Sequence, residues 1–203
     1  MTDDPGTARW FEEWTPEQRA DYAERFIKLA AAGHDIDGEA RLIDALASRA
    51  CRILDAGCGT GRVAAALAAR GHEVLGVDLD PALIAAGLQQ YPGLPLAELD
   101  LLSLSPALGA FDLIVSAGNV MVYLTPDTER AVVAAMASVL KPGGRAVFGF
   151  ATDRSYTVAD LDADAAAVGW SLEGRYATWQ LDPSLPESDW AVSIYRAGPS
   201  DAY

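Results

Sequence analysis

The chain has 203 residues and carries 29 acidic against 15 basic side chains, which gives a formal net charge of −14 at pH 7. Hydrophobic residues make up 51% and charged residues 22%, as in a globular protein and unlike a disordered one. The acidic excess argues against nucleic acid and anionic membranes as partners, because both need Lys and Arg to neutralise phosphate. The length predicts one domain over residues 1–203.

The start of the chain and its two cysteines bear on location. Residues 1–5 are acidic and lack the charged-then-apolar order of a signal peptide. The apolar runs fall short of the roughly 18 residues of a membrane span. Cys51 and Cys58 bracket an extended apolar stretch that would hold them about 20 Å apart, beyond the reach of a disulfide. We expect a cytoplasmic protein with two free thiols.

Two helices are expected ahead of the first strand, at 16–32 and 38–48. In the first of them, apolar residues recur at spacings of four and three, so one face of the helix is apolar. Residues 1–50 are therefore predicted to cap the core, and a lid over a substrate pocket is a compatible interpretation. The aromatic residues of this segment include Trp10, Phe11, Trp14, Tyr22 and Phe26.

Strands and helices alternate from residue 51 onward. Gly71 is a helix stop and Pro81 a helix start. Such alternation predicts βαβ units and a parallel sheet that is covered on both faces. The predicted strands are 51–55, 73–78, 95–98, 111–116 and 145–150, and the predicted helices are 60–70, 82–90 and 127–140, with a turn at 141–144.

The last part of the chain has a different pattern. A helix at 157–168 precedes two strand-like segments, 170–181 and 190–196, which the turn residues Asp182 and Pro183 would allow to pair antiparallel. The sequence therefore predicts a doubly wound, Rossmann-like α/β fold. Its core would occupy 51–203, with seven mostly parallel strands, the last one antiparallel, and helices on both faces of the sheet.

Three glycines, Gly57, Gly59 and Gly61, stand between the first strand and its helix. They let the backbone turn tightly and let a ligand approach it at the carboxyl edge of the sheet. A dinucleotide fingerprint that starts at Gly57 would place Arg62 where a small residue is needed, whereas a start at Gly59 would place the tolerated Ala64 there. An NAD(P)-dependent oxidoreductase thus remains an alternative, and a P-loop does not, because Gly-Lys-Ser/Thr is missing.

Acidic residues accompany the first three strands. Asp55 heads the pattern D-x-G-x-G-x-G, and Asp78 and Asp100 follow the next two strands. In these features, and in its Leu-Lys-Pro-Gly-Gly turn, the chain resembles the class I S-adenosylmethionine (SAM)-dependent methyltransferases. Residues 38–44 and 118–121 also resemble stretches of uncharacterised bacterial methyltransferases of small-molecule type. The resemblance covers most of the chain. It implies SAM as the cofactor, S-adenosylhomocysteine as its product and no metal.

The resemblance also implies roles for single residues. Asp78 is similar to the family's ribose binder, and Leu79 to the residue that covers one adenine face. Asp100 would accept the adenine amino group, with the Leu101 amide near the ring, and Asp55 would hold the sulfonium or amino end or, alternatively, brace the loop. Further residues implied at the cofactor are Gly57, Cys58, Gly59, Gly61, Ser116, Gly118 and Arg41, the last as a carboxylate clamp unless it forms a plain surface ion pair.

The acceptor side has weaker signals. The loop after the fourth strand should face the departing methyl group, so Asn119 and Tyr123 are candidates for the substrate pocket, with core packing as the alternative for this loop. His34 lies between the two leading helices and could overhang the pocket as a catalytic group. His72 sits in a turn remote from that edge and is interpreted as structural.

The expected partner is a small molecule. Histidines and cysteines are too few and scattered for a metal cluster, and the Asn/Asp-Pro-Pro-aromatic signature of methylases acting on planar amino nitrogens is missing. The predicted function is SAM-dependent methyl transfer by in-line displacement. A SAM-binding module without catalysis and a SAM-dependent enzyme of another reaction type remain alternatives, and the protein could be a monomer or a homodimer.

Overall fold

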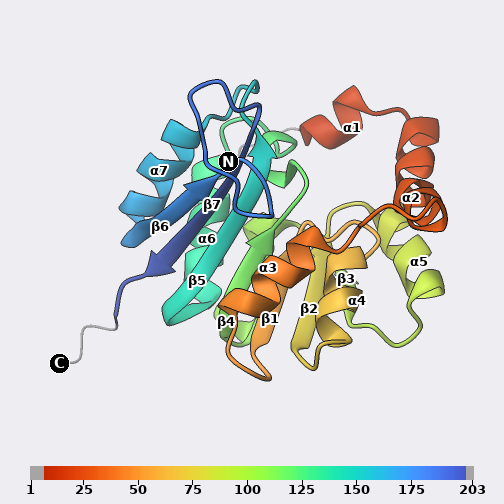
Figure 1. The fold of residues 1–203 in the computed structure, drawn as a ribbon, viewed down its shortest axis with the longest axis horizontal. Helices are drawn as coiled ribbons and strands as arrows, with labels where there is room; N and C mark the ends of the chain where they lie inside the picture. The colour runs from red at the N-terminus through yellow and green to blue at the C-terminus, as the bar shows by residue number, and fades with distance from the viewer. Residues whose placement is uncertain (1–6, 200–203) are drawn as a thin grey trace, which may run out of the picture.

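The computed structural model describes residues 7–199. The first six residues of the expected lid, and with them the chain start judged for a signal peptide, lie outside the described residues. Seven strands form one sheet in the order β3-β2-β1-β4-β5-β7-β6 (Figure 1). The strands are β1 (Arg52–Ala56), β2 (Glu73–Asp78), β3 (Leu96–Glu98), β4 (Phe111–Ser116), β5 (Leu140–Ala151), β6 (Trp170–Tyr176) and β7 (Trp190–Ala197).

Strand pairing is parallel from β3 through β5, and β7 runs antiparallel to both β5 and β6. This confirms the predicted Rossmann-like sheet with its last strand antiparallel. Parallel pairing brings the carboxyl ends of β1 to β4 to one edge, where the loops that follow them meet. Cys51 and Cys58 lie at the two ends of β1, and both are free.

Helices cover both faces of the sheet. Ile53 and Leu113 face the core shared with α3 and α4, whereas Leu54 and Ile114 face the core shared with α6 and α7. Because β1 and β4 are buried on both sides, apolar residues stand next to each other in both, as in Ile53-Leu54 and Leu113-Ile114-Val115. The helices are α3 (Gly38–Leu46), α4 (Arg62–Ala68), α5 (Pro81–Gln90), α6 (Glu129–Val139) and α7 (Val158–Ala167), and the short 3₁₀ turns are η1 (Leu101–Ser103), η2 (Pro106–Leu108) and η3 (Val120–Val122).

Two further helices, α1 (Arg9–Glu13) and α2 (Pro16–Ala31), stand over the carboxyl edge, where α2 lies beside α5 and α1 bonds to the loop after β4 (Figure 1). A capping box of Thr15 and Gln18 starts α2. No residue of α2 is fully buried, so packing against the core does not hold it. Among residues 7–199, no helix combines the length and the apolar character that crossing a membrane requires.

Element ends differ from the prediction where the backbone takes positive φ. Helix α6 starts at Glu129 and not at residue 127, because Asp127 has φ +66°. Strand β6 ends at Tyr176, because residues 177–182 form a turn that contains Leu181 with φ +67° and is closed by the Ala177 N–H donating to the Asp182 carbonyl at 2.9 Å. The predicted 141–144 turn belongs to β5, whose pairing with β4 shifts register between Phe111 and Leu113.

Candidate functional site

The glycine loop is fixed to the end of β2. The Gly57 N–H donates to the Val77 carbonyl at 2.8 Å, and the Gly59 N–H donates to Asp78 Oδ2 at 2.8 Å. Gly57 has φ +80°, and a Cβ there would lie 2.4 Å from a methyl of Val120. Only glycine therefore fits this position, and the loop is held where β2 ends.

Asp78 terminates β2 with both carboxylate oxygens engaged. Oδ2 accepts the Gly59 N–H, and Oδ1 accepts the Asp80 N–H at 2.9 Å. Burial raises the pKa of Asp78, although these backbone donors oppose the rise. Each oxygen keeps a lone pair for a further donor. The carboxylate can therefore accept two neighbouring hydroxyl groups at once.

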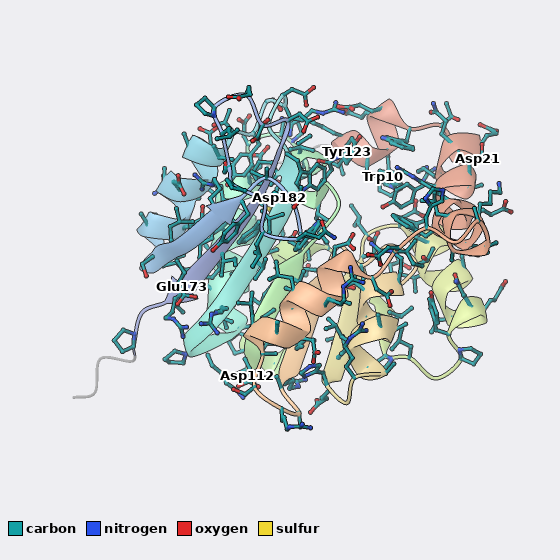
Figure 2. The ribbon with its side chains drawn as sticks, viewed as in Figure 1. Trp10, Asp21, Asp112, Tyr123, Glu173 and Asp182 are labelled. Atoms are coloured by element: carbon teal, nitrogen blue, oxygen red, sulfur yellow. The ribbon has the colours of Figure 1, made fainter. Side chains whose placement is uncertain are left out.

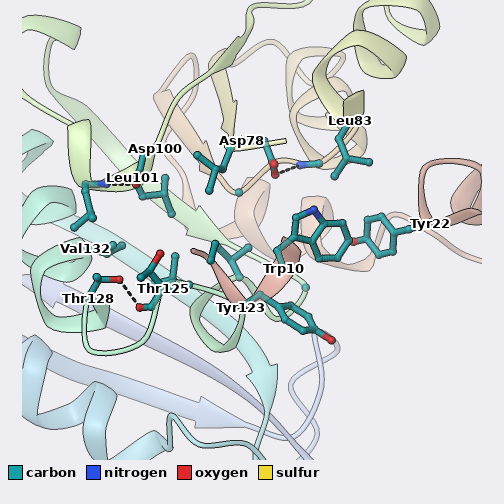
Figure 3. A pocket seen from close by; sticks show the side chains of 18 residues that line it. Trp10, Tyr22, Asp78, Leu83, Asp100, Leu101, Tyr123, Thr125, Thr128 and Val132 are labelled. Atoms are coloured by element: carbon teal, nitrogen blue, oxygen red, sulfur yellow. Dashed lines mark hydrogen bonds between the residues drawn. The ribbon is translucent and has the colours of Figure 1, made fainter. Parts of the chain in front are cut away.

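A cavity of about 100 Å³ opens beside Asp78, and Figure 3 shows the side chains around it. Its other acid, Asp100, caps η1 by accepting the Leu102 N–H at 2.9 Å. Apolar side chains and two threonines complete the lining, so a ring system could lie between them. The lining includes Gly57, Gly59, Asp78, Leu79, Asp100, Leu101, Gly118, Tyr123, Thr125, Thr128 and Val132.

Aromatic side chains close the cavity from above. We call Trp10, Trp14, Tyr22, Phe26 and Tyr123 the aromatic roof. Trp10 stacks on Trp14 at 4.9 Å between ring centroids and meets Tyr22 and Tyr123 edge-on at 5.4 and 5.7 Å. In Figure 3, Trp10 and Tyr22 lie side by side across the opening from Asp100. The roof joins α1 and α2 to the loop after β4, and this matches the lid interpretation in position.

One carboxylate connects the lid to the cavity. Asp80 is 1% exposed, and its Oδ2 accepts Trp10 Nε1 and Arg19 Nη1, each at 2.9 Å. Its Oδ1 caps α5 through the Ala82 N–H. Burial raises the pKa of Asp80, but the three donors outweigh it and hold the pKa below its usual value. The N–H of Asp80 also donates to Asp78. The turn at residues 78–80 therefore contacts both the lid, through Asp80, and the cavity, through Asp78.

A second, smaller cavity of about 60 Å³ lies beside the glycine loop and contains Asp55, Glu39 and Arg62. Asp55 is 1% exposed and accepts the Ala64 N–H at 3.0 Å. Burial raises its pKa to about 7, against the opposing charge of Arg62. Arg62 pairs with Glu39 at 2.6 Å and stacks over Phe26. This cavity therefore offers two carboxyl groups and one guanidinium, which can face the opposite charges of a zwitterion.

The structure places the other predicted residues outside the first cavity. Asn119 accepts the Ala151 N–H at 2.8 Å through its side chain and ties two loops together. Arg41 donates to Asp35 at 2.8 Å on the exposed surface and lines neither cavity. His34 lines an open groove of about 500 Å³ along α2, which shares Tyr22 with the two cavities but does not include the cavity acids.

Three loop residues are also accounted for. Cys58 lines the smaller cavity, and burial raises the pKa of its thiol. Gly61 faces β3, because a Cβ there would lie 2.9 Å from Leu96. The Ser116 hydroxyl is buried, with no hydrogen-bond partner in the part of the chain that the structure describes. Within residues 7–199, no cluster of three His, Cys, Asp or Glu side chains could hold a metal.

Sequence reasoning missed residues that the structure brings to the site. Asp80 precedes Pro81, an Asp-Pro pair typical of a helix start, but its contacts to Trp10 could not be foreseen. The sequence indicates Tyr22 only as one aromatic residue of the cap, whereas the structure places it in the lining of both cavities and of the groove that contains His34. Arg62 was considered only for its bulk, and its proximity to Glu39 depends on how α3 packs on α4.

Comparisons with known proteins agree with this geometry. The family described as "Methyltransferase domain" matches residues 53–144. A TehB-like SAM-dependent methyltransferase from Corynebacterium glutamicum is 44% identical, over 89% of this chain and 98% of that one, with a TM-score of 0.83.

Two curated relatives match shorter segments. Magnesium-protoporphyrin O-methyltransferase of Rhodobacter capsulatus is 37% identical over 39% of this chain. Trans-aconitate 2-methyltransferase of Deinococcus radiodurans is 41% identical over 46% of it. The matches span only 37% and 35% of these relatives' own lengths. The match to the Corynebacterium glutamicum protein, which covers 89% of this chain and 98% of that one, shows that the chain belongs to the SAM-dependent methyltransferases.

Proposed function

We propose that this protein binds SAM at the carboxyl edge of its sheet and transfers the methyl group to a small-molecule acceptor. The observation that carries the proposal is the cavity in which Asp78, Asp100 and the glycine loop meet. Family membership supports the reaction type. The names of the relatives refer to chemically different acceptors, so they support the reaction more than any one acceptor.

The donors and acceptors of the two cavities suit the parts of SAM. Asp78 would accept both ribose hydroxyls, and Asp100 the amino group of adenine, with Leu79 and Leu101 against the ring. In the smaller cavity, Asp55 or Glu39 would hold the ammonium group of the methionine part, and Arg62 its carboxylate. Since Arg62 lines that cavity and Arg41 does not, we assign the carboxylate to Arg62.

The space, however, is too small with the lid in its present position. The main cavity measures about 100 Å³, whereas ligand pockets usually measure about 300 Å³ or more. We therefore infer that α1 and α2 move away from the loop after β4 to admit SAM. The aromatic roof would then close over it and exclude water.

Bound SAM would supply a methyl group that its sulfonium already activates. The chain then has to align the acceptor in line with that group and keep water away, which can account for several kcal/mol of the barrier. Gly118, with φ +77°, lets the loop after β4 approach the reacting centre. Tyr22 and Tyr123 both line the main cavity, and the Tyr22 hydroxyl lies near Gly118. An acceptor that carries a proton would release it to a base or to water.

Asp78→Asn tests the cofactor assignment. The amide can no longer accept two hydroxyl groups through a charged group, and hydrogen bonds to a charged group contribute about 1.5–3 kcal/mol each. SAM affinity measured by calorimetry should therefore fall roughly ten- to a hundred-fold. Asp44→Asn, whose carboxylate lies beside His72, is the matched control and should bind SAM normally. Unchanged affinity in a folded Asp78→Asn protein would refute the ribose assignment.

The acceptor requires a direct screen. Purified protein with methyl-labelled SAM and a small-metabolite library should yield a labelled product together with S-adenosylhomocysteine. Tight NAD(P) binding without SAM affinity would overturn the proposal. SAM binding without any transfer would indicate a cofactor-binding module.

A further inference from the structure

A second groove lies at the amino edge of the sheet, at the opposite end of the strands from the proposed cofactor site. It measures about 430 Å³. Residues 46–51 after α3, residues 141–145 of β5 and Arg196 of β7 line it, together with Asp112 and Leu113. Figure 2 shows this edge at the bottom of the view, where Asp112 is labelled. We call it the amino-edge groove.

The charge of the amino-edge groove is opposite to that of the molecule. Four basic residues line it, Arg49, Lys141, Arg145 and Arg196, against a single acid, Asp112. In the whole chain acids outnumber bases by 29 to 15. A local positive potential in a strongly acidic protein selects anions that the remaining surface repels.

Two of the guanidinium groups are held rigidly. Arg145 and Arg196 are cross-strand partners, and their Nε atoms donate to the two oxygens of Glu173 at 2.6 and 2.5 Å. The Nη1 atoms donate to the carbonyls of Leu46 and Gly143, each at 2.9 Å. Hydrogen bonds from Arg145 above all hold the pKa of Glu173 below its usual value.

Within residues 7–199, Arg145 and Arg196 keep positive charge that is not neutralised and N–H groups that are free to donate. Two arginines directly opposite each other on a sheet repel, and one Glu173 carboxylate neutralises only one of them. In the described part of the chain, the Nη2 atoms of both arginines have no hydrogen-bond partner. Lys141 is paired with Asp112 at 2.7 Å, so the arginines carry the excess.

Arg49 adds a third guanidinium on a strained loop. It is exposed and has no carboxylate within ion-pair distance among residues 7–199. The next residue, Ala50, has φ +52°, a left-handed conformation that costs a non-glycine residue about 1–2 kcal/mol. Both residues line the groove. Strain of this kind is found preferentially at ligand sites.

We propose that the amino-edge groove binds a small polyvalent oxyanion, such as a phosphate group or a di- or tricarboxylate. Guanidinium groups present paired N–H donors that match the oxygens of both chemistries. Two held arginines and Arg49 would balance at least two negative charges. The site does not depend on the methyl transfer proposed above, because it lies at the other edge of the sheet.

Thermal unfolding with inorganic phosphate, citrate and chloride at equal ionic strength tests the site. Phosphate or citrate at millimolar concentration should raise Tm beyond the chloride control, since a ligand that binds the folded state stabilises it. Calorimetry should give at least ten-fold weaker anion binding for Arg49→Gln, which removes no ion pair, and for Arg196→Gln. Arg154→Gln, an exposed arginine beside Asp153, is the control and should bind like wild type.

The outcomes separate the possible sources of an effect. Stabilisation by phosphate alone would identify a phosphate site, and stabilisation by citrate alone a polycarboxylate site. The proposal is overturned if neither anion exceeds chloride or if both variants bind like wild type. Loss of the anion effect in the presence of saturating S-adenosylhomocysteine would place the anion at the cofactor edge and overturn it as well.

Discussion

Asp55 shows how one residue can serve the fold and the site. Its carboxylate accepts the N–H of Ala64, one of the free N–H groups in the first turn of α4, and so fixes the helix against β1. The same carboxylate lines the smaller cavity, where a cationic ligand would find it. Burial makes its charged form costly. Asp55 can accept the Ala64 N–H whether its carboxyl group is protonated or ionised. A cationic ligand in the smaller cavity would favour the ionised form.

The raised pKa of Asp55 predicts a pH-dependent stability. Its ordinary pKa is 3.8 and its pKa in the fold is about 7, so the folded state binds the proton more tightly than the unfolded state. Its contribution is fully present below pH 4 and is lost as pH rises through about 7. Asparagine does not ionise, so Asp55→Asn does not lose this stability as the pH rises. We expect the variant to gain stability relative to wild type between pH 4 and pH 8, by up to about 4 kcal/mol.

Urea unfolding of wild type and Asp55→Asn between pH 4 and pH 8 measures the difference in their free energies of unfolding. The other carboxylates titrate in both proteins, so their contributions cancel in this difference. Glu129→Gln is a suitable control, because Glu129 is also buried but pairs with Arg9 at 2.9 Å. A difference between Asp55→Asn and wild type that stays constant with pH would contradict the argument.

Tyr22 is the second residue whose role can be tested alone. Its hydroxyl lies 3.8 Å from the Cβ position of Gly118, and its ring lies 3.8 Å from that of Gly59. Burial above all raises the pKa of the phenol, which keeps it a neutral donor. Under the proposed function, Tyr22→Phe should lower kcat/KM by roughly three- to ten-fold, because the lost hydrogen bond would contribute about 0.5–1.5 kcal/mol to the transition state. Its SAM affinity should stay within about two-fold of wild type.

Tyr91→Phe, at the far end of α5, should leave both quantities unchanged, since its hydroxyl accepts a hydrogen bond from Gln90 and Tyr91 lines neither cavity. An equal fall of SAM affinity and turnover in Tyr22→Phe would assign the hydroxyl to cofactor binding and contradict the expected split.

At the scale of elements, the lid is attached by a few polar contacts and by the aromatic roof. Helix α2 has no fully buried residue, and the backbone of α1 bonds to the loop after β4 through Trp10 N–H to the Tyr123 carbonyl at 3.2 Å. Asp80 binds both helices, through Trp10 and Arg19. An element with few buried apolar contacts opens locally at low free energy. The lid can therefore move without unfolding the sheet.

Trp10→Phe isolates one of these contacts. It removes the indole donor to Asp80 but keeps an aromatic ring in the roof. A hydrogen bond to a charged group is worth about 1.5–3 kcal/mol, so S-adenosylhomocysteine should dissociate roughly ten-fold faster in a radiolabel chase. Trp190→Phe is matched to it, because the buried Trp190 indole N–H has no partner in the described residues. Equal dissociation rates in Trp10→Phe and wild type would show that Asp80 does not hold the lid closed.

At the scale of the molecule, the sequence predicted the sheet better than the site. The alternation from residue 51 predicts the βαβ order because buried strands and amphipathic helices have different periods. Helix α1 was missed, since five residues show no helical period. Positions of glycines and acids after strands follow from topology and could be predicted. Contacts between the lid and β2 could not, because they join residues about 60 to 70 positions apart.

The two edges of the sheet also differ in charge, which the overall composition of the chain does not reveal. The main cavity at the carboxyl edge has Asp78 and Asp100 as its only charged lining, whereas the amino-edge groove is basic. A net charge of −14 averages over both. The acidic excess predicts weak binding of polyanions to the surface as a whole, but it carries no information about a single groove.

The stacked pair of Trp10 and Trp14 gives the protein an optical property of its own. Two of the five tryptophans of the chain lie in the lid, and their rings are 4.9 Å apart. The other three, Trp170, Trp179 and Trp190, belong to the last third of the chain. Indole emission depends on contact with neighbouring rings and with water, so separation of the lid from Tyr123 would change it. The protein thus contains an intrinsic fluorophore pair with which the position of its lid can be followed without any added label.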